Sequence, residues 1–259
     1  MTPLVDVLIP VYKPNPAHLR AALSSLLAQT ETRWTALVRD DASGADLEAY
    51  RKEFPDPRIR WTRGEERLGI GGNWNACWRK GTAPFVQYLF QDDVWEPAYL
   101  ERARAVFDDH PEVGFVSVGH RYGVEGGMTN APAYEELVRF KDESLQRGLH
   151  RGREFLRWWM DRGLHPNVVG EPSFVMLRRS VMERVGPFDE AMPQFLDVEY
   201  WIRMLLASDW YYLPDDLGMF RVHAAAASAV NSQTGAGIYD RLTCFERLIA
   251  RAPTPELKA

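Results

Sequence analysis

Two adjacent carboxylates, Asp92 and Asp93, follow an apolar run over residues 85–90 that is typical of a buried β-strand. Open α/β sheets bind their ligands at the carboxyl ends of strands, so we expect these acids to lie at a ligand site. One carboxylate would hold a divalent cation, and the other would accept hydrogen bonds from a sugar hydroxyl. The alternative is a pair of solvated turn residues, because aspartate is common after strands.

Other polar residues end the first two predicted strands. Pro10 and Tyr12 close the strand over residues 4–10, and Asp41 follows the next strand. At the shared edge of a parallel sheet, Tyr12 would stack on a nucleotide base and Asp41 would accept one of its N–H groups. A packed tyrosine and an Asx turn are the alternatives. The chain lacks a G-x-x-x-x-G-K-S/T phosphate loop, so a Mg²⁺ or Mn²⁺ ion on Asp93 is the expected means of neutralising phosphates.

Two acids open an amphipathic helix that is predicted over residues 197–208. Asp197 or Glu199 would be a general base that deprotonates an acceptor hydroxyl, with helix capping as the alternative. The two side chains differ by about 200° around a helix, so only one of them faces a given site. Further along, Arg221 and His223 follow a strand-like segment, where they would face a phosphate and a metal. A surface salt bridge and a packed histidine are the simpler readings of this pair.

The composition bounds the class of protein. The chain has 259 residues, of which 46% are hydrophobic, and a net charge of −5, which is typical of a globular protein and argues against nucleic-acid binding. It contains two distant cysteines outside any metal-ligand spacing, and neither a signal peptide nor an apolar run long enough for a membrane span. We therefore expect a cytoplasmic protein.

Strand and helix patterns alternate in the first half, which predicts a mostly parallel sheet with helices on both faces. Strands are predicted over residues 4–10, 34–38, 59–62, 85–90 and 113–118, with helices from residue 16 and over 46–54, 73–80 and 96–109. Residues 120–150 are expected to form a long irregular connection. Helices then follow over 151–162, 197–208 and 237–250, and strands over 173–177 and 210–213.

The ordered motifs resemble the family 2 glycosyltransferases of the GT-A fold over roughly residues 4–228. The resemblance is carried by Val7-Leu8-Ile9-Pro10-Val11-Tyr12, Leu26 to Thr30, Val38 to Ser43, Gly69 to Asn75, Gln91-Asp92-Asp93, Arg178-Arg179-Ser180, Gly186 to Glu190, Asp197 to Arg203 and Arg221-Val222-His223. It implies an α/β Rossmann-like fold. Residues 1–119 would form the nucleotide-sugar half, residues 120–230 the half with the acceptor and the catalytic base, and residues 231–259 a C-terminal helix.

The resemblance also implies a metal-dependent, inverting transfer of a sugar to a hydroxyl group. The nucleotide sugar would be bound by Pro10, Tyr12, Asp41, Asn75, Asp92 and Arg221, the metal (Mn²⁺ or Mg²⁺) by Asp93 and His223, and Asp197 would be the catalytic base. Asp92 would lie on the sugar side of the DXD-like Asp-Asp pair. Leu196 stands where the family usually has a glutamate beside the base, which affects acceptor orientation.

The implied partners are a UDP-, GDP- or dTDP-sugar donor and a glycan, polysaccharide or lipid-linked acceptor, with peripheral membrane contact. Acceptor selectivity is expected within residues 120–172, which include His120, Arg121, Trp158, Trp159 and Glu171. Two other classes stay open. A nucleotidyltransferase also uses metal-binding acids on an α/β sheet, but it would need a basic phosphate loop that the chain lacks. A non-catalytic nucleotide-sugar-binding protein is the other, favoured by Leu196.

Overall fold

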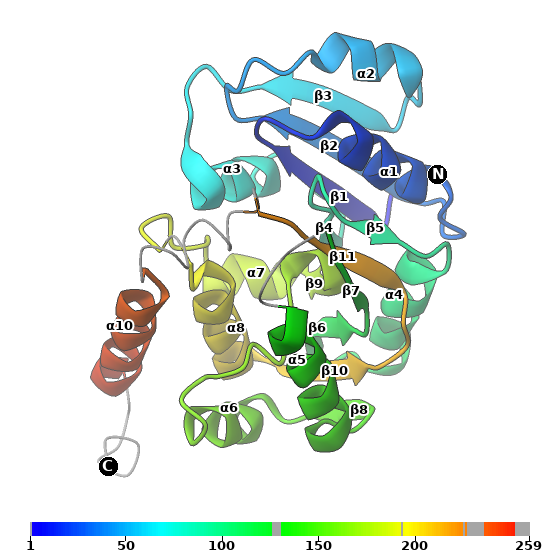
Figure 1. Cartoon of the computed structure of the whole chain (residues 1–259). Helices are drawn as coiled ribbons and strands as arrows, with labels where there is room; N and C mark the ends of the chain where they lie inside the picture. Colours follow the sequence, from blue (N-terminus) through cyan, green and yellow to red (C-terminus); the bar gives the residue numbers. More distant parts are fainter. Residues whose placement is uncertain (1, 126–130, 193, 225, 227–235, 252–259) are drawn as a thin grey trace.

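The computed structural model describes residues 2–125, 131–192, 194–224, 226 and 236–251. Eight strands form one central sheet in the order β3-β2-β1-β4-β9-β6-β10-β8 (Figure 1). These strands are β1 (Val5–Val11), β2 (Trp34–Asp40), β3 (Ile59–Arg63), β4 (Phe85–Tyr88), β6 (Val113–Val118), β8 (Gly148–His150), β9 (Val175–Arg178) and β10 (Asp209–Leu213). A small second sheet has the order β5-β11-β7, with β5 at Val94–Trp95, β7 at Arg121–Val124 and β11 at Gly218–Val222.

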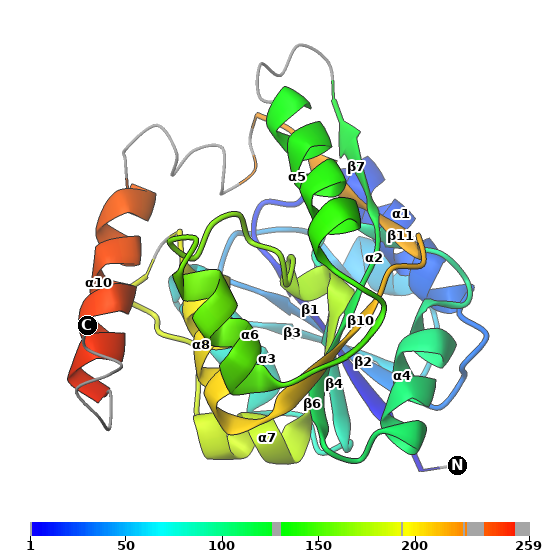
Figure 2. The same ribbon diagram turned by 90° about the horizontal axis from the view of Figure 1, so that it is seen from below.

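Helices cover both faces of the central sheet (Figure 2). They are α1 (Pro16–Leu27), α2 (Leu47–Glu53), α3 (Gly69–Trp78), α4 (Tyr99–Asp109), α5 (Ala131–Ser144), α6 (Gly152–Met160), the 3₁₀-helix η1 (Pro172–Phe174), α7 (Arg179–Val185), α8 (Leu196–Ala207) and α10 (Ala236–Arg251). The apolar faces of α1, α2 and α4 pack in one core, whereas α3, α6, α7 and α8 pack in the other. Among the described residues, no helix is both long and apolar enough to cross a membrane.

The first four strands, β3, β2, β1 and β4, are parallel, as the sequence predicts. The residues of β1 explain its central place, because all seven are buried. Val7 and Ile9 enter the core with α1 and α4, while Leu8 enters the opposite core, as the alternation of a strand requires. The α/β class, the mostly parallel sheet and the helices on both faces are therefore confirmed.

Residues from the predicted second half complete the same sheet. Strand β9 pairs antiparallel with both β4 and β6, and β10 pairs parallel with β6. The prediction of an irregular connection over residues 120–150 is wrong, since this segment contains β7, α5 and β8. The segment is polar and has little helical periodicity, but Pro132 lies in the first turn of α5, where a missing backbone N–H is tolerated.

Candidate active site

Two adjoining cavities open beside the carboxyl ends of the central strands. The first has a volume of about 500 Å³ and the second, which borders α5, about 710 Å³. Of the predicted site residues, the first cavity is lined by Pro10, Tyr12, Asp41, Asp92, Asp93, Asp197, Arg221 and His223. Both cavities share Glu171, Gln194, Asp197 and Phe220 in their walls. The structure therefore brings together all but one of the residues that the sequence predicted for the donor, the metal and the base.

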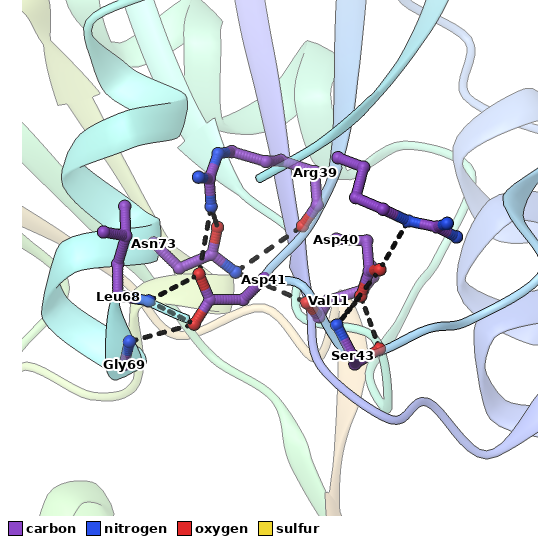
Figure 3. A network of polar contacts seen from close by, with 9 residues as sticks. Val11, Arg39, Asp40, Asp41, Ser43, Leu68, Gly69 and Asn73 are labelled. Atoms are coloured by element: carbon purple, nitrogen blue, oxygen red, sulfur yellow. Dashed lines mark hydrogen bonds and ion pairs between the residues drawn. The ribbon is translucent and has the colours of Figure 1, made fainter. Parts of the chain in front are cut away.

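Asp41 anchors one end of the first cavity (Figure 3). Its carboxylate accepts the backbone N–H groups of Leu68 and Gly69 at 2.9–3.1 Å, which are the first groups of α3. The guanidinium of Arg39 also donates to it at 3.1 Å and to the Asn73 amide oxygen at 2.6 Å. Asp41 thus fixes the loop before α3 against the end of β2. Its contact with a base remains a prediction.

Tyr12 presents a flat surface at the same end. The guanidinium carbon of Arg67 lies 4.4 Å from the centre of the Tyr12 ring, a stacking distance. The side chain of Gln91 holds the backbone there, because its Oε1 accepts the Tyr12 N–H at 2.9 Å. Sequence reasoning missed Arg67, although it stands just before the glycine-rich first turn of α3, where a cation beside an anion site is a readable signal.

Asn75 is the predicted site residue that lies outside the cavity walls. It is fully buried in α3, and its amide exchanges two hydrogen bonds of 2.9 Å with the backbone of Phe188. A third bond, to Glu190, uses its remaining amide hydrogen at 2.9 Å. Because these bonds occupy the side chain, the prediction that Asn75 contacts the nucleotide sugar is corrected. Asn75 instead joins α3 to the loop before α8.

The metal-ligand geometry centres on Asp92. Ligand atoms of His18, Asp92 and His223 lie within 4.8 Å of one another. His18 Nδ1 is 3.2 Å from Asp92 Oδ1, and His223 Nε2 is 3.4 Å from Asp92 Oδ2. His223 therefore pairs with Asp92, whereas the sequence assigned it to a metal on Asp93. His18, from the first turn of α1, was missed because a lone histidine in a helix carries no pattern.

Asp93 lines the same cavity but is not a member of this three-residue group. It is 1% exposed, and its Oδ1 accepts the backbone N–H of Arg221 at 3.0 Å. Burial raises the pKa of Asp93 to about 8. The Arg221 side chain donates to the carbonyl of Asp92 and to Glu125, both at 3.0 Å. Asp93 and Arg221 together fix β11 against the turn that carries Asp92. The binding of a metal by Asp93 and His223 stays a prediction.

The donor set around Asp92 fits a divalent transition ion. Imidazole nitrogen and carboxylate oxygen both suit Mn²⁺, and Mg²⁺ takes the carboxylate. His18 Nε2 lies 3.0 Å from Glu125 Oε1, while its Nδ1 faces Asp92. A carboxylate behind a ligating histidine is the common arrangement at metal sites. His223 Nε2 is buried without a hydrogen bond to any described residue, which also leaves it free for a ligand.

Asp197 occupies the junction of the two cavities, in the first turn of α8. Its Oδ2 accepts from the Asn167 amide at 2.8 Å, and its Oδ1 accepts the Val198 N–H at 2.8 Å. Burial raises the pKa of Asp197 to about 7, and the charge of Glu171 adds to the rise. A carboxyl group with this pKa can exchange a proton near neutral pH.

Glu199, the other acid of this turn, faces away from the cavities. It is buried and forms an ion pair of 2.6 Å with Arg203, one helical turn later. The sequence prediction that only one of the two acids reaches the site agrees with these contacts. Glu199 holds α8 on the loop before it, because Arg203 also donates to the carbonyls of Val185 and Pro187 at 2.9 Å.

Comparison with known families decides the class of protein. The sequence model described as glycosyl transferase family 2 matches residues 6–186, which include the whole cluster of strand-end acids. The chain belongs to glycosyl transferase family 2. It is a glycosyltransferase that takes its sugar from a nucleotide-sugar donor. The protein is 34% identical over 99 residues to the Escherichia coli enzyme WfgD, a UDP-Glc:alpha-D-GlcNAc-diphosphoundecaprenol beta-1,3-glucosyltransferase. This match covers 38% of each chain.

Solved structures place this glycosyltransferase in the GT-A fold. TarS 1-349 of S. aureus in complex with UDP-GlcNAc superposes with a TM-score of 0.73 at 14% identity, covering 100% of this chain and 69% of that one. The mannosyltransferase PcManGT from Pyrobaculum calidifontis, in complex with GDP-Man and Mn²⁺, gives a TM-score of 0.68 at 18% identity, covering 99% and 67%. At these identities the likeness establishes the shared fold.

Proposed function

We propose that the cavity of about 500 Å³ binds a nucleoside diphosphate sugar together with Mn²⁺ or Mg²⁺, and that Asp197 is the base for an inverting transfer to an acceptor hydroxyl. The observation that carries the proposal is the position of Asp197. It lines the cavity that contains the cluster around Asp92 and also the second cavity. An acceptor hydroxyl in the second cavity and a sugar in the first would meet at this carboxylate.

The nucleotide end of the donor would lie at Tyr12 and Arg67. A base can stack on this pair, since both present flat faces, and the Arg67 charge attracts phosphate. Asp41 and the backbone of Pro10 line the same part of the cavity. Both TarS and PcManGT were solved with nucleotide sugars, which supports a donor in the corresponding fold. The candidate nucleotides are UDP, GDP and dTDP.

The diphosphate end would lie at Asp92. His18, Asp92 and His223 would hold the metal ion, which when bound stabilises the charge of a departing diphosphate. The Mn²⁺ of PcManGT supports a divalent ion in this fold. Glu125 and Arg221 orient the cluster: Glu125 holds the His18 ring, and Arg221 holds the carbonyl of Asp92.

At the sugar end of the donor, Asn167 would hold Asp197 in position and Asp197 would accept a proton. Asn167 fixes Asp197 Oδ2, and the carboxylate takes the proton of the acceptor hydroxyl as the oxygen attacks the anomeric carbon. Asp197 lines both cavities, and the proposal has an acceptor in the second cavity attack from the side opposite to the leaving diphosphate. A single displacement from that side inverts the anomeric configuration.

The second cavity suits a neutral glycan hydroxyl. Its wall has the aromatic side chains of Tyr134, Phe140 and Phe195, which can stack on sugar rings, and more carboxylates than cations. Other residues expected to select the acceptor lie elsewhere. Trp159 is fully buried and donates to the carbonyl of Pro166 at 2.8 Å, and Arg121 pairs with Glu96 at 2.8 Å. Their part in acceptor selection would be indirect.

The proposal predicts a pH dependence. Asp197 must be ionised to accept a proton, and burial raises its pKa to about 7. We therefore expect kcat/KM to fall about tenfold per pH unit below pH 7 and to level off above it. The Asn167 amide lowers this pKa, so Asn167→Ala should move the acid limb to higher pH. The assignment predicts a change in kcat/KM of roughly 100-fold between pH 5 and pH 7. A value of kcat/KM that stays constant from pH 5 to pH 8 would contradict it.

A ligand screen tests the proposed donor site. Thermal unfolding is measured with UDP, GDP, dTDP and their sugars, each with and without Mn²⁺. One nucleotide series should raise the Tm in the presence of Mn²⁺, because a ligand at about a hundredfold excess over Kd stabilises by about 2.7 kcal/mol. Product analysis then separates the classes: transfer of a sugar supports the proposal, and transfer of a nucleotidyl group would support a nucleotidyltransferase. Binding without any turnover would support a non-catalytic binding protein.

A further inference from the structure

We propose that the carboxylate of Glu171 accepts a hydrogen bond from a hydroxyl group of the transferred sugar and thereby selects neutral sugars as donors. The inference rests on the proposed function, because it places a residue within the proposed donor site. Glu171 has no place in the proposed proton transfer or in the cluster around Asp92. It nevertheless lines both cavities, which makes its position the first step of the argument.

The backbone before Glu171 is fixed from several sides. Gly170 has a φ of +106°, a conformation that favours glycine, and its carbonyl accepts the indole N–H of Trp201 at 2.9 Å. Its N–H donates to Asn167 Oδ1 at 3.1 Å. Asn167 is the residue that also holds Asp197, through a bond of 2.8 Å. Asn167 therefore holds both the segment that carries Glu171 and the proposed base, Asp197. The two carboxylates are fixed in position relative to each other.

Two neighbouring side chains contact the carboxylate of Glu171. His120 is 1% exposed at its side chain, and its Nε2 lies 3.0 Å from Glu171 Oε2. The Tyr122 hydroxyl donates to Glu171 Oε1 at 3.2 Å. The His120 ring is itself fixed, because Nδ1 lies 3.1 Å from the Val118 carbonyl and the ring stacks on Phe174 with centroids 4.0 Å apart. Glu171 is therefore held in one orientation before any ligand binds.

The charge of Glu171 is maintained by its surroundings. Burial alone would raise the pKa of the carboxyl group, but His120 and Lys141 lower it, and the net direction is downward. Lys141 comes from α5 and is 5% exposed, and it forms no direct ion pair with a carboxylate of the described residues. A carboxylate that stays ionised is an acceptor only, so its ligand must be a donor such as a hydroxyl or amide N–H group.

Glu171 keeps capacity for such a donor. An ionised carboxylate has about four lone-pair positions, of which the Tyr122 and His120 contacts use two. Its side chain is 17% exposed, toward the cavities that it lines. The open part of this carboxylate is therefore available to a ligand.

The place of Glu171 in the cavity identifies the ligand as the donor sugar. Its charge acts on both Asp93, behind the proposed diphosphate site, and Asp197, the proposed base. The sugar to be transferred must lie between the diphosphate and the base. Glu171, whose pKa is lowered, and Asp197, which is ionised when it acts as the base, line this part of the cavity, so a uronic acid would be repelled and a neutral hexose or N-acetylhexosamine accepted.

The test compares binding of nucleoside diphosphates with that of their sugars. Calorimetric titrations with Mn²⁺ use UDP, UDP-glucose, UDP-GlcNAc, UDP-glucuronic acid, GDP and GDP-mannose. The variants are Glu171→Gln, Tyr122→Phe and the matched control Glu112→Gln, which lies just before β6 at the opposite edge of the sheet. Glu171→Gln should weaken the affinity for the nucleotide sugar about 10-fold or more, because a hydrogen bond to a charged group is lost. The affinity for the nucleoside diphosphate alone should stay as in the wild type.

Further outcomes separate selection from a structural role. Glu171→Gln should also narrow the preference for neutral sugars over UDP-glucuronic acid, because one repelling charge is removed. Tyr122→Phe keeps that charge, so it should give a smaller loss of sugar binding and carries the test if Glu171→Gln does not fold. If Glu171→Gln weakens the binding of the nucleoside diphosphate and of the nucleotide sugar equally, or weakens neither, the inference about Glu171 is wrong. The proposed function is not affected by that result. A wild type that binds none of the nucleotide sugars contradicts the proposed function as well.

Discussion

Asp197→Asn should lower kcat by about 10²–10⁴-fold, the usual contribution of a general base, while the affinity for the donor stays close to that of the wild type. The amide has the size of the carboxylate but cannot accept the proton of the acceptor hydroxyl at neutral pH. The amide keeps one acceptor oxygen, so it retains one of the two bonds that Asn167 and Val198 now donate to the carboxylate. The loss should therefore appear in kcat and in kcat/KM together, as expected for an interaction made in the transition state.

Two other acids provide controls for this experiment. Asp161→Asn removes an exposed carboxylate at the end of α6 and should leave kcat unchanged. Glu199→Gln removes the ion pair with Arg203 and should lower the stability of the protein without comparable loss of kcat in the folded fraction. If Glu199→Gln instead reproduces the kinetic loss and Asp197→Asn does not, the assignment of the base to Asp197 is wrong.

Asp92→Asn should abolish the Mn²⁺-dependent rise in Tm and lower transfer by at least about 100-fold. The substitution removes the negative charge between His18 and His223, which leaves two imidazoles as a weak site. Donor binding should also lose its dependence on Mn²⁺, because the proposed ion joins the diphosphate to this cluster. Thermal unfolding and donor titration at several Mn²⁺ concentrations measure both effects.

The comparison with Asp93→Asn distinguishes the two adjacent acids. Asp93 is buried against the backbone of Arg221 and is not a member of the three-residue ligand cluster. Its replacement should lower stability while the folded protein keeps its response to Mn²⁺. His110→Ala, a change to a histidine outside the cavities, should alter neither property. A Mn²⁺ response that is lost in Asp93→Asn but kept in Asp92→Asn would return the metal to the position expected from sequence.

The strand–helix alternation in the first half could be predicted because each strand is short, apolar and bounded by turn residues. Val7 and Ile9 illustrate this, since β-branched side chains that are buried by the sheet make the pattern continuous. The segment over residues 120–150 escaped prediction for the opposite reason. Strand β7 is only partly buried and pairs with β11, nearly a hundred residues later, so its local sequence carries little signal.

The site could be predicted where residues end strands or begin helices. Asp41, Asp92 and Asp197 are of this kind, and the structure places all three in one cavity wall. His18 could not be found, since only the folded protein brings α1 beside the turn after β4. Asn75 was misassigned because its position in a motif says nothing about its partners, which come from the loop before α8.

The most direct test of the central claim measures donor binding and turnover on the same preparations of wild type and Asp197→Asn. Each protein is titrated with the nucleotide sugar selected by the thermal screen, and release of nucleoside diphosphate is followed with Mn²⁺ and an acceptor glycan. We predict that both proteins bind the donor, that only the wild type releases diphosphate at a substantial rate, and that its product has the inverted anomeric configuration. Equal release by both proteins, or a product with retained configuration, would contradict the account.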